Sequence, residues 1–316
     1  MTELYFCNQP ESIQKVYGLV ERVYTQAEVL ADPAQFAGVR YIFSTWGMPK
    51  LTEAQIEACF PKLEAVFYAA GSVQDFARPF LRRGVTVCSA WAANGVPVAE
   101  YATAQIILAN KRFFSALALQ RDPAAAKALR DEIRGNYGDC VGILGAGMIG
   151  KRVIGMLKSY HLSVRVFDPF LPEDTARELG VTLCDLPEVF ASCTVVSNHL
   201  ANNEATRGMI TGDLLRTMPH GATFLNTGRG AQVREAELCV VLRERPDLTA
   251  VLDVTDPHSP GTREELAALP NCWLTPHIAG SLGMECRRMG ELMWEEYRHG
   301  APYRWAVTEK MLETMA

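Results

Sequence analysis

The sequence lacks the features that would direct it to a membrane, a nucleic acid or a secretory route. No apolar run approaches the roughly 20 residues that cross a bilayer, and the N-terminus, MTELYFCNQP, has neither the basic start nor the apolar stretch of a signal peptide. The formal net charge is −5 and there is no basic block, which disfavours nucleic acid and anionic membrane as partners. We therefore expect a cytoplasmic protein that binds a small molecule.

The cysteines also lack a pattern. There are nine of them, an odd number, with no CxxC pair and mostly inside apolar runs. A disulfide framework or a zinc site would need regular or paired spacing. We expect buried, reduced thiols and no metal.

The 316 residues, 48% of them hydrophobic, are enough for two domain cores, and they contain no internal repeat. Short β-type apolar runs alternate with helical stretches, which is typical of parallel α/β sheets. In the first hundred residues the predicted strands are 3–7, 39–44, 63–69 and 85–90. A helix is predicted over 52–60, because Thr52 and Gln55 have the spacing of a capping box.

A second α/β series begins at residue 139. Its predicted strands are VGILG, VRVFD, CTVVSN, ATFLN, TAVLDV and CWLTP, each separated from the next by a helical stretch except the last two. A long helix is predicted over 96–120, reaching from one domain into the other, and a helix within 280–300 is free to pack back on the first domain. The sequence therefore predicts one domain made of 1–97 and 284–316, with a doubly wound domain, 98–283, inserted in it.

The stretch GILGAGMIG predicts a dinucleotide site. An apolar strand runs into Gly145, Gly147 and Gly150, which fit GxGxxG and precede a helix. The first glycine permits the turn, the second lets a pyrophosphate approach bare backbone, and the third lets helix pack on strand. The phosphates would meet the helix N-terminus, so Met148 and Ile149 belong to the predicted site.

Asp168 lies at the tip of the next strand, eighteen residues beyond Gly150. Its carboxylate can accept hydrogen bonds from both hydroxyls of an adenosine ribose, whereas a 2′-phosphate would meet a like charge. We therefore expect NAD rather than NADP. The alternative is that Asp168 only caps the helix that starts at Pro172.

Polar side chains follow three further strands. Arg229 lies between glycines in FLNTGRGAQV, His277 follows Thr-Pro in WLTPHIAGS, and His258 ends LDVTDPH. Ligands collect beyond the carboxyl ends of parallel strands, so we expect the three to share a crevice. A guanidinium can bind a carboxylate and polarise a carbonyl, and imidazole can exchange a proton near neutral pH. Taken singly, such residues are as typical of turns and structural hydrogen bonds as they are of active sites. Their joint placement after three strands favours a reaction site.

The sequence resembles the D-isomer-specific 2-hydroxyacid dehydrogenases over almost the full chain. The matching segments, in the family's order, are NGVPVAEYA (94–102), GILGAGMIG (142–150), FDP (167–169), NHLANNEATRGMI (198–210), LNTGRGAQV (225–233), VLDVTDP (251–257) and LTPHIAGS (274–281). The resemblance implies two doubly wound parallel-sheet α/β domains, a Rossmann NAD-binding domain inserted in a flavodoxin-like substrate domain. It also implies hydride transfer between nicotinamide and a small 2-hydroxy or 2-keto acid.

The resemblance assigns roles to individual residues. Arg229 would bind the substrate carboxylate and keto oxygen, and His277 would be the acid/base at the carbonyl. The cofactor side of the site would include His199, Thr227 and Asp253, the last at the nicotinamide carboxamide. The substrate carboxylate would be held by the YAAGSVQ segment, at Ala70, Gly71 and Ser72.

One departure from the family concerns the acid/base. The family normally has a glutamate in the loop after LDV, often as DPEP, where it pairs with the histidine; this sequence has DPHS. His258 thus stands in the carboxylate's place, and His277 lacks that anionic partner unless Asp256, Glu264 or Glu265 reaches it. A neutral imidazole can accept or donate a hydrogen bond but cannot stabilise an imidazolium as an anion does. We expect weakened 2-keto acid reduction at neutral pH, unless His258 faces solvent and a nearby acid substitutes.

A second departure is HLANNEAT, where the family usually has a proline after His-Leu. The altered loops leave open an alternative function, an NAD(H)-sensing regulator resembling the family's corepressors, although Arg229 and His277 are intact. The apolar surface of 96–120 and of the segment after it exceeds what one domain needs, which predicts a homodimer through this region.

Overall fold

The computed structural model describes residues 1–258 and 261–313. The described chain forms two compact units, the first made of Met1–Gly95 and residues 281–313, the second of Val96–Gly280. These boundaries lie two and three residues before the predicted ones. The last three residues of the predicted first domain, 314–316, lie outside the described residues.

The first unit is built on a four-stranded parallel sheet. Its strands are β1 (Glu3–Tyr5), β2 (Tyr41–Ser44), β3 (Ala65–Tyr68) and β4 (Thr86–Ser89), in the order β1-β2-β3-β4. Each lies inside a predicted strand. Tyr24 forms a parallel bridge with Phe6 beside the free edge of β1. With that bridge counted, the order is 2-1-3-4-5, which is the flavodoxin-like order expected from the resemblance.

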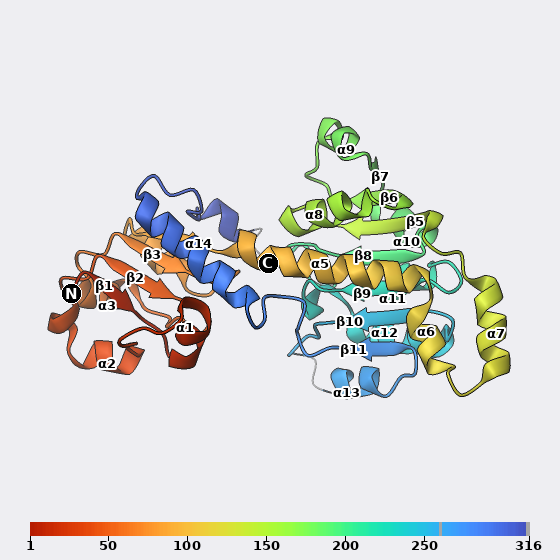
Figure 1. Cartoon of the computed structure of the whole chain (residues 1–316), viewed down its shortest axis with the longest axis horizontal. Helices are drawn as coiled ribbons and strands as arrows, with labels where there is room; N and C mark the ends of the chain where they lie inside the picture. The colour runs from red at the N-terminus through yellow and green to blue at the C-terminus, as the bar shows by residue number, and fades with distance from the viewer. Residues whose placement is uncertain (259–260, 314–316) are drawn as a thin grey trace. The chain divides into compact units, whose positions relative to one another are not determined.

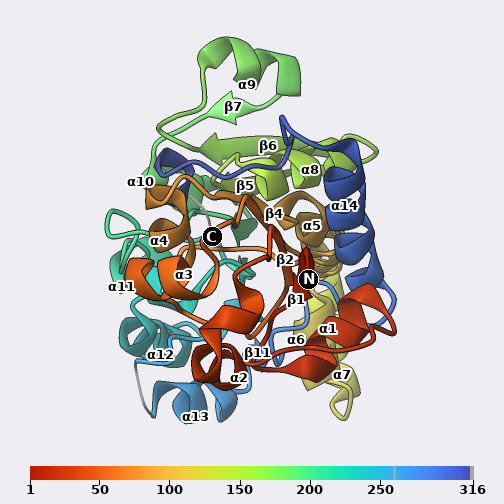
Figure 2. The same cartoon turned by 90° about the vertical axis from the view of Figure 1, so that its left-hand side faces the viewer.

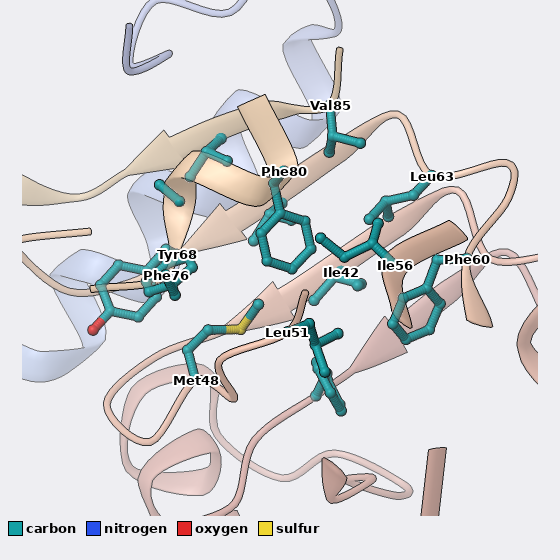
Figure 3. Packing of buried hydrophobic residues seen from close by; sticks show 14 of the residues in the cluster. Ile42, Met48, Leu51, Ile56, Phe60, Leu63, Tyr68, Phe76, Phe80 and Val85 are labelled. Carbon is teal, nitrogen blue, oxygen red and sulfur yellow. The ribbon is translucent and has the colours of Figure 1, made fainter. Parts of the chain in front are cut away.

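Helices cover both faces of this sheet because successive strand residues point to opposite sides. The helical elements are α1 (Pro10–Tyr17), α2 (Gln26–Ala31), η1 (Pro33–Phe36), α3 (Glu53–Cys59), α4 (Ala77–Arg82), α14 (Glu285–His299) and η3 (Lys310–Glu313). Ile42 packs with Ile56 and Phe80 of α3 and α4, as Figure 3 shows. On the other face, Phe43 stacks on Trp294 of α14 with ring centroids 4.6 Å apart.

Two predictions for this unit are confirmed at the level of single contacts. The Thr52 side chain accepts a hydrogen bond from the backbone of Gln55, and the Gln55 side chain accepts one from the backbone of Thr52, so the capping box starts α3. The C-terminal helix α14 packs on the sheet of the first unit, as its apolar spacing predicted.

The second unit contains a seven-stranded parallel sheet (Figure 1). Its strands are β5 (Tyr137–Leu144), β6 (His161–Phe167), β7 (Thr182–Leu183), β8 (Val195–Asn198), β9 (Thr223–Asn226), β10 (Thr249–Leu252) and β11 (Cys272–Leu274). The order β7-β6-β5-β8-β9-β10-β11 is the doubly wound 3-2-1-4-5-6 order with one strand added. The order reverses between β5 and β8, which is where such sheets bind ligands. Figure 2 shows the short β7, which the sequence did not predict, with α9 (Glu173–Leu179) at the edge beyond β6.

Helices again cover both faces. The remaining helical elements are α5 (Trp91–Asn110), α6 (Phe113–Ala118), α7 (Pro123–Glu132), α8 (Met148–Leu157), α10 (Leu186–Ser192), α11 (Gly212–Arg216), η2 (Gly230–Gln232), α12 (Glu235–Glu244) and α13 (Thr262–Ala267). Ile143 and Leu225 pack on the side of α5 and α8. Phe224 packs on the opposite side, with residues of α10, α11, α12 and α13. Among the described residues, no helix is both long and apolar enough to cross a membrane.

The prediction of one helix over 96–120 is wrong. The helix α5 begins earlier, at Trp91, and ends at Asn110, and α6 follows after a break at Arg112. Arg112 has φ 50°, a left-handed conformation that costs a non-glycine residue about 1 kcal/mol. Its guanidinium lies 2.8 Å from Glu132, which helps to hold the turn. Neither glycine nor proline marks this position, so the sequence gave no local signal of the break.

Candidate active site

The three glycines after β5 differ in what surrounds them. Gly145 has φ +87°, and a Cβ built on it would lie 2.8 Å from the His199 carbonyl oxygen. A Cβ on Gly150 would lie 2.1 Å from the Gly145 carbonyl oxygen. Gly147, by contrast, has no described atom within 4 Å of its Cβ position. Two glycines are thus needed for packing inside the protein, whereas the second one faces open space.

The open glycine lies at the start of a helix that has no side-chain cap. Gly147 is the N-cap of α8, and no side chain of the described chain accepts a hydrogen bond from the first turn, which includes Met148 and Ile149. Free backbone amides and the helix dipole favour an anion at this position. The turn therefore fits a pyrophosphate group.

Asp168 follows β6 and is joined to the glycine turn. Its carboxylate accepts hydrogen bonds from the backbone of Ala146 at 2.7 Å and of Phe170 at 2.9 Å, one on each oxygen. The N-cap of α9 is Pro172, and no side-chain hydrogen bond caps that helix, so capping is not the role of Asp168. Each carboxylate oxygen keeps a second lone pair that can accept a hydroxyl of a ribose.

His199 and Thr227 lie just after β8 and β9. The His199 backbone donates to Leu144 at 2.7 Å, and its ring is within 2.9 Å of the Ser197 hydroxyl. Burial lowers the pKa of His199 to about 4, so the ring is neutral at neutral pH. The Thr227 hydroxyl is buried and has no hydrogen-bond partner among the described residues. Such a group is costly to bury alone and suits a polar ligand.

The loops that follow β8, β9, β10 and β11, with the start of α13, line an open cavity of about 590 Å³. Arg229, Asp253, His258 and His277 all belong to its wall. The three strand-end stretches picked out in the sequence are therefore brought to one cavity of the second unit. The turn at 145–150, Asp168, His199 and Thr227 lie outside this wall.

Arg229 is a half-buried cation without an acid partner. Its Nη1 donates to the Gly228 carbonyl at 2.8 Å, and no carboxylate among the described residues lies within salt-bridge distance of it. Burial lowers the pKa of the guanidinium from its ordinary value, although arginine stays charged at neutral pH. Gly230 lets this loop touch the next one, because a Cβ there would lie 2.1 Å from the backbone of Asp256.

A buried amide network, which the sequence analysis missed, supports the Arg229 loop. Asn198 donates to Asn226 at 3.0 Å and to Gln232 at 2.6 Å, and Gln232 accepts from the Arg229 backbone at 3.1 Å. All three amide side chains are buried. The only sequence signal was the position of these polar residues at strand ends and directly after Arg229.

Asp253 holds the loop that carries His277. The buried carboxylate accepts hydrogen bonds from the Thr275 hydroxyl at 2.6 Å and from the backbone of Ile278 and Ala279 at 2.8 Å each. The His277 backbone donates to the Asp253 carbonyl at 3.0 Å and has a left-handed φ of 57°. These bonds position an exposed imidazole, and Oδ2 of Asp253 keeps one lone pair for a further donor.

The His258 side chain is also exposed. Its backbone donates to Asp256 at 3.0 Å. Of the three acids considered as substitutes for the family's glutamate, Asp256 belongs to the cavity wall, while Glu265 pairs with Arg243 at 3.1 Å. Glu264 is not among the wall residues of the described chain.

Glu235 anchors the loop between β10 and α13, which includes His258, and the sequence analysis missed it. Its buried carboxylate accepts hydrogen bonds from the Asp256 backbone at 2.8 Å and from the Thr262 hydroxyl at 3.1 Å. Burial raises the pKa of Glu235 above its ordinary value. Nothing in the first turn of an amphipathic helix distinguishes a buried acid from an exposed one.

In the first unit, the segment Ala70, Gly71 and Ser72 follows β3. The Ser89 hydroxyl donates to the carbonyls of Ala70 and Gly71. The backbone amides of Gly71 and Ser72 have no acceptor among the residues that the structure describes. Two such amides suit a carboxylate oxygen.

Comparison with known proteins places this arrangement in a family. Residues 103–279, more than half of the chain, match the model of the D-isomer specific 2-hydroxyacid dehydrogenase, NAD binding domain. D-3-phosphoglycerate dehydrogenase of Archaeoglobus fulgidus is 29% identical over 237 residues, which cover 73% of this chain and 44% of that protein. Erythronate-4-phosphate dehydrogenase of Ectopseudomonas mendocina is 39% identical over 140 residues, which cover 44% of this chain and 35% of that protein. The chain thus aligns with less than half the length of these relatives.

Solved structures share the fold along the whole chain. Apo D-mandelate dehydrogenase of Rhodotorula graminis is 17% identical, with a TM-score of 0.79 and 98% of each chain covered. The NAD-complexed D-isomer specific 2-hydroxyacid dehydrogenase of Lactobacillus delbrueckii ssp. bulgaricus is 18% identical, with a TM-score of 0.76, covering 98% of this chain and 100% of that one. At these identities the likeness concerns the fold.

Proposed function

Because the chain belongs to the D-isomer specific 2-hydroxyacid dehydrogenase family, we propose that it catalyses NAD-linked interconversion of a small 2-hydroxy acid and the matching 2-keto acid. The observation that supports this most directly is the presence of Arg229 and His277 in the wall of one cavity, after the carboxyl ends of β9 and β11, the two strands that flank β10. Arg229 is a cation without an acid partner among the described residues, and His277 can exchange a proton.

The second unit contains the residues proposed to hold the cofactor. The amides at the start of α8 would bind the pyrophosphate over Gly147, and Asp168 would accept the adenosine ribose hydroxyls. The unpartnered hydroxyl of Thr227, the neutral ring of His199 and the free lone pair of Asp253 offer further polar contacts. When bound, the nicotinamide supplies or takes up the hydride. The carboxylate of Asp168 favours NAD over NADP.

Each unit contains hydrogen-bond donors that suit a substrate carboxylate. We propose that the Arg229 guanidinium binds the carboxylate and polarises the keto oxygen, since Arg229 has no competing acid partner among the described residues. In the first unit, the proposed substrate domain, the backbone amides of Gly71 and Ser72 have no acceptor among the described residues, and we propose that they bind carboxylate oxygen.

His277 would carry the proton. During reduction it donates a proton to the keto oxygen as the carbon gains hydride, and during oxidation it accepts the hydroxyl proton. The hydrogen bonds that the backbone amides of residues 277–279 donate to Asp253 fix the backbone that carries this ring. Because His258 stands where a glutamate is expected, we propose that imidazolium on His277 lacks its usual carboxylate support and that reduction weakens toward neutral pH.

We do not extend the proposal to an NAD(H)-sensing regulator without turnover. Both Arg229 and His277 line the cavity, and cofactor sensing alone would not require either of them there.

We propose further that the protein is a cytoplasmic homodimer. Leu108, Phe113 and Leu117 on α5 and α6 are 36–40% exposed, which leaves an apolar surface available to a second copy. The nine free thiols suit a reducing compartment. Light scattering on the wild type and on Phe113→Glu tests the dimer, which the charged variant should dissociate.

The experiment for the activity follows NADH absorbance with a panel of 2-keto acids, next to a fluorescence titration with NADH. Turnover of at least one acid supports the proposal. Tight NADH binding without turnover of any of them would contradict it and favour a sensor.

A further inference from the structure

The cavity wall contains more arginines than the proposed reaction uses. Besides Arg229, it includes Arg207 and Arg263. Arg207 follows β8, and Arg263 belongs to the helix α13 that follows β10. Binding one carboxylate and moving one proton requires neither of these two side chains.

The acidic side chains of the wall bind hydrogen-bond donors of the protein itself. The Asp253 carboxylate accepts hydrogen bonds from three donors in residues 275–279. Asp256 accepts the His258 backbone amide through Oδ1. Arg263 donates to the Thr255 hydroxyl at 3.2 Å, and Arg207 lies 3.9 Å from Glu204, in a pair whose side chains are 54% and 93% exposed. Such an exposed ion pair, beyond hydrogen-bond distance, contributes little, so the Arg207 guanidinium remains available to a ligand.

The loop that precedes Arg263 is anchored at two described residues. Glu235 binds its start at Asp256 and its end at Thr262, the residue before Arg263. On the other side, the contact of Gly230 with the Thr255–Asp256 backbone fixes this loop against the one that carries Arg229. Arg263 thus directly follows an anchored residue, Thr262, and lines the same cavity as Arg229.

We propose that the substrate carries a second anionic group, a phosphate or a carboxylate, at the end away from its keto carbon, and that Arg207 and Arg263 bind that group. The inference rests on the proposed function and names the substrate class of the same site. Guanidinium groups bind phosphate and carboxylate oxygens through paired, charge-assisted hydrogen bonds. A substrate with a neutral tail would offer neither guanidinium an anion to bind.

Binding is measured first, because it does not depend on turnover. Calorimetric titrations use the protein loaded with NAD⁺, which cannot reduce a keto acid, and three probes: pyruvate, 2-oxoglutarate and 3-phosphohydroxypyruvate. We expect at least one of the two dianionic probes to bind about tenfold or more tightly than pyruvate. The tighter of the two identifies the second group as carboxylate or phosphate. Equal or weaker binding of both relative to pyruvate overturns the inference.

Variants assign the preference to residues. Arg207→Gln and Arg263→Gln should each remove most of the dianion preference while changing pyruvate binding by less than about twofold. Arg243→Gln is the matched control, because Arg243 pairs with Glu265 and is not in the cavity wall. If both wall variants keep the full preference, or weaken pyruvate equally, the assignment is wrong.

Turnover with NADH separates this inference from the function on which it rests. Turnover of pyruvate without a preference for either dianion leaves the dehydrogenase proposal intact and refutes the second anion site. Selective dianion binding without turnover of any probe supports the site and counts against the dehydrogenase proposal.

Discussion

A methyl group at Gly147 should weaken NADH binding while leaving the fold intact. No described atom lies within 4 Å of the Cβ position, so alanine meets nothing in the protein itself. Alanine is a poorer N-cap than glycine, which costs about 0.5 kcal/mol. Where a pyrophosphate must approach the backbone, the added methyl group should crowd it and make NADH binding about 1–3 kcal/mol less favourable, which raises Kd roughly 5- to 160-fold.

The other glycines of α8 and its turn provide controls. For Gly150→Ala, a Cβ 2.1 Å from the Gly145 carbonyl costs about 3 kcal/mol, and the better helix propensity of alanine recovers about 1 kcal/mol. The net loss of about 2 kcal/mol should lower Tm by about 4–8 °C. Gly155→Ala, with nothing within 4 Å and no place in the turn, should leave NADH binding unchanged.

The assays are thermal unfolding of the cofactor-free protein and fluorescence titration with NADH. The reasoning is refuted if Gly147→Ala binds NADH within about twofold of the wild type. It is equally refuted if Gly147→Ala loses as much stability as Gly150→Ala, because the two glycines would then have the same packing role.

Three further predictions concern pH. His258→Glu should place an anion in the loop that faces the His277 cavity and raise, by roughly one pH unit, the pH above which the rate of keto-acid reduction falls, giving about tenfold more activity at pH 8. An unchanged pH profile would show that the residue at position 258 does not affect proton transfer. His199 has a pKa lowered to about 4 by burial, so the unfolded chain binds the extra proton first and the wild type loses stability as pH falls from about 6.5 to about 4. Urea unfolding at several pH values should show a smaller acid loss for His199→Gln, and parallel curves would contradict this. Burial raises the pKa of Glu235, so its contribution to stability is greatest below the ordinary glutamate value and falls as pH rises through the folded one. The stability of Glu235→Gln relative to the wild type should therefore increase from pH 4 to pH 7, and a pH-independent difference would argue against a buried, ionising carboxylate.

The parts of the fold that could be predicted are those with a local or periodic signal. The capping box at Thr52 and the apolar strands of both sheets follow from spacing alone, and GxGxxG identified the turn after β5. The break at Arg112 has no such signal, because it depends on contacts with Glu132 and with the Asp247 carbonyl, far along the chain. The two-residue β7 is too short for alternation to appear.

The same division holds for the site. Arg229 and His277 could be predicted because chemistry-bearing residues after parallel strands must meet at one edge of the sheet. The supports of that site could not. Glu235 and Gln232 act through burial and long-range hydrogen bonds, and in the sequence they look like ordinary polar residues of a helix and a loop.

The central claim is that Arg229 and His277 act together on a substrate at the cavity. Its most direct test compares the wild type with Arg229→Gln and His277→Gln, by NADH oxidation with the 2-keto acid that the wild type uses best and by NADH titration. We expect each variant to lose about 100-fold or more in kcat/KM while its Kd for NADH stays within about threefold. Turnover that survives in either variant at about a tenth of the wild-type rate or above would contradict it.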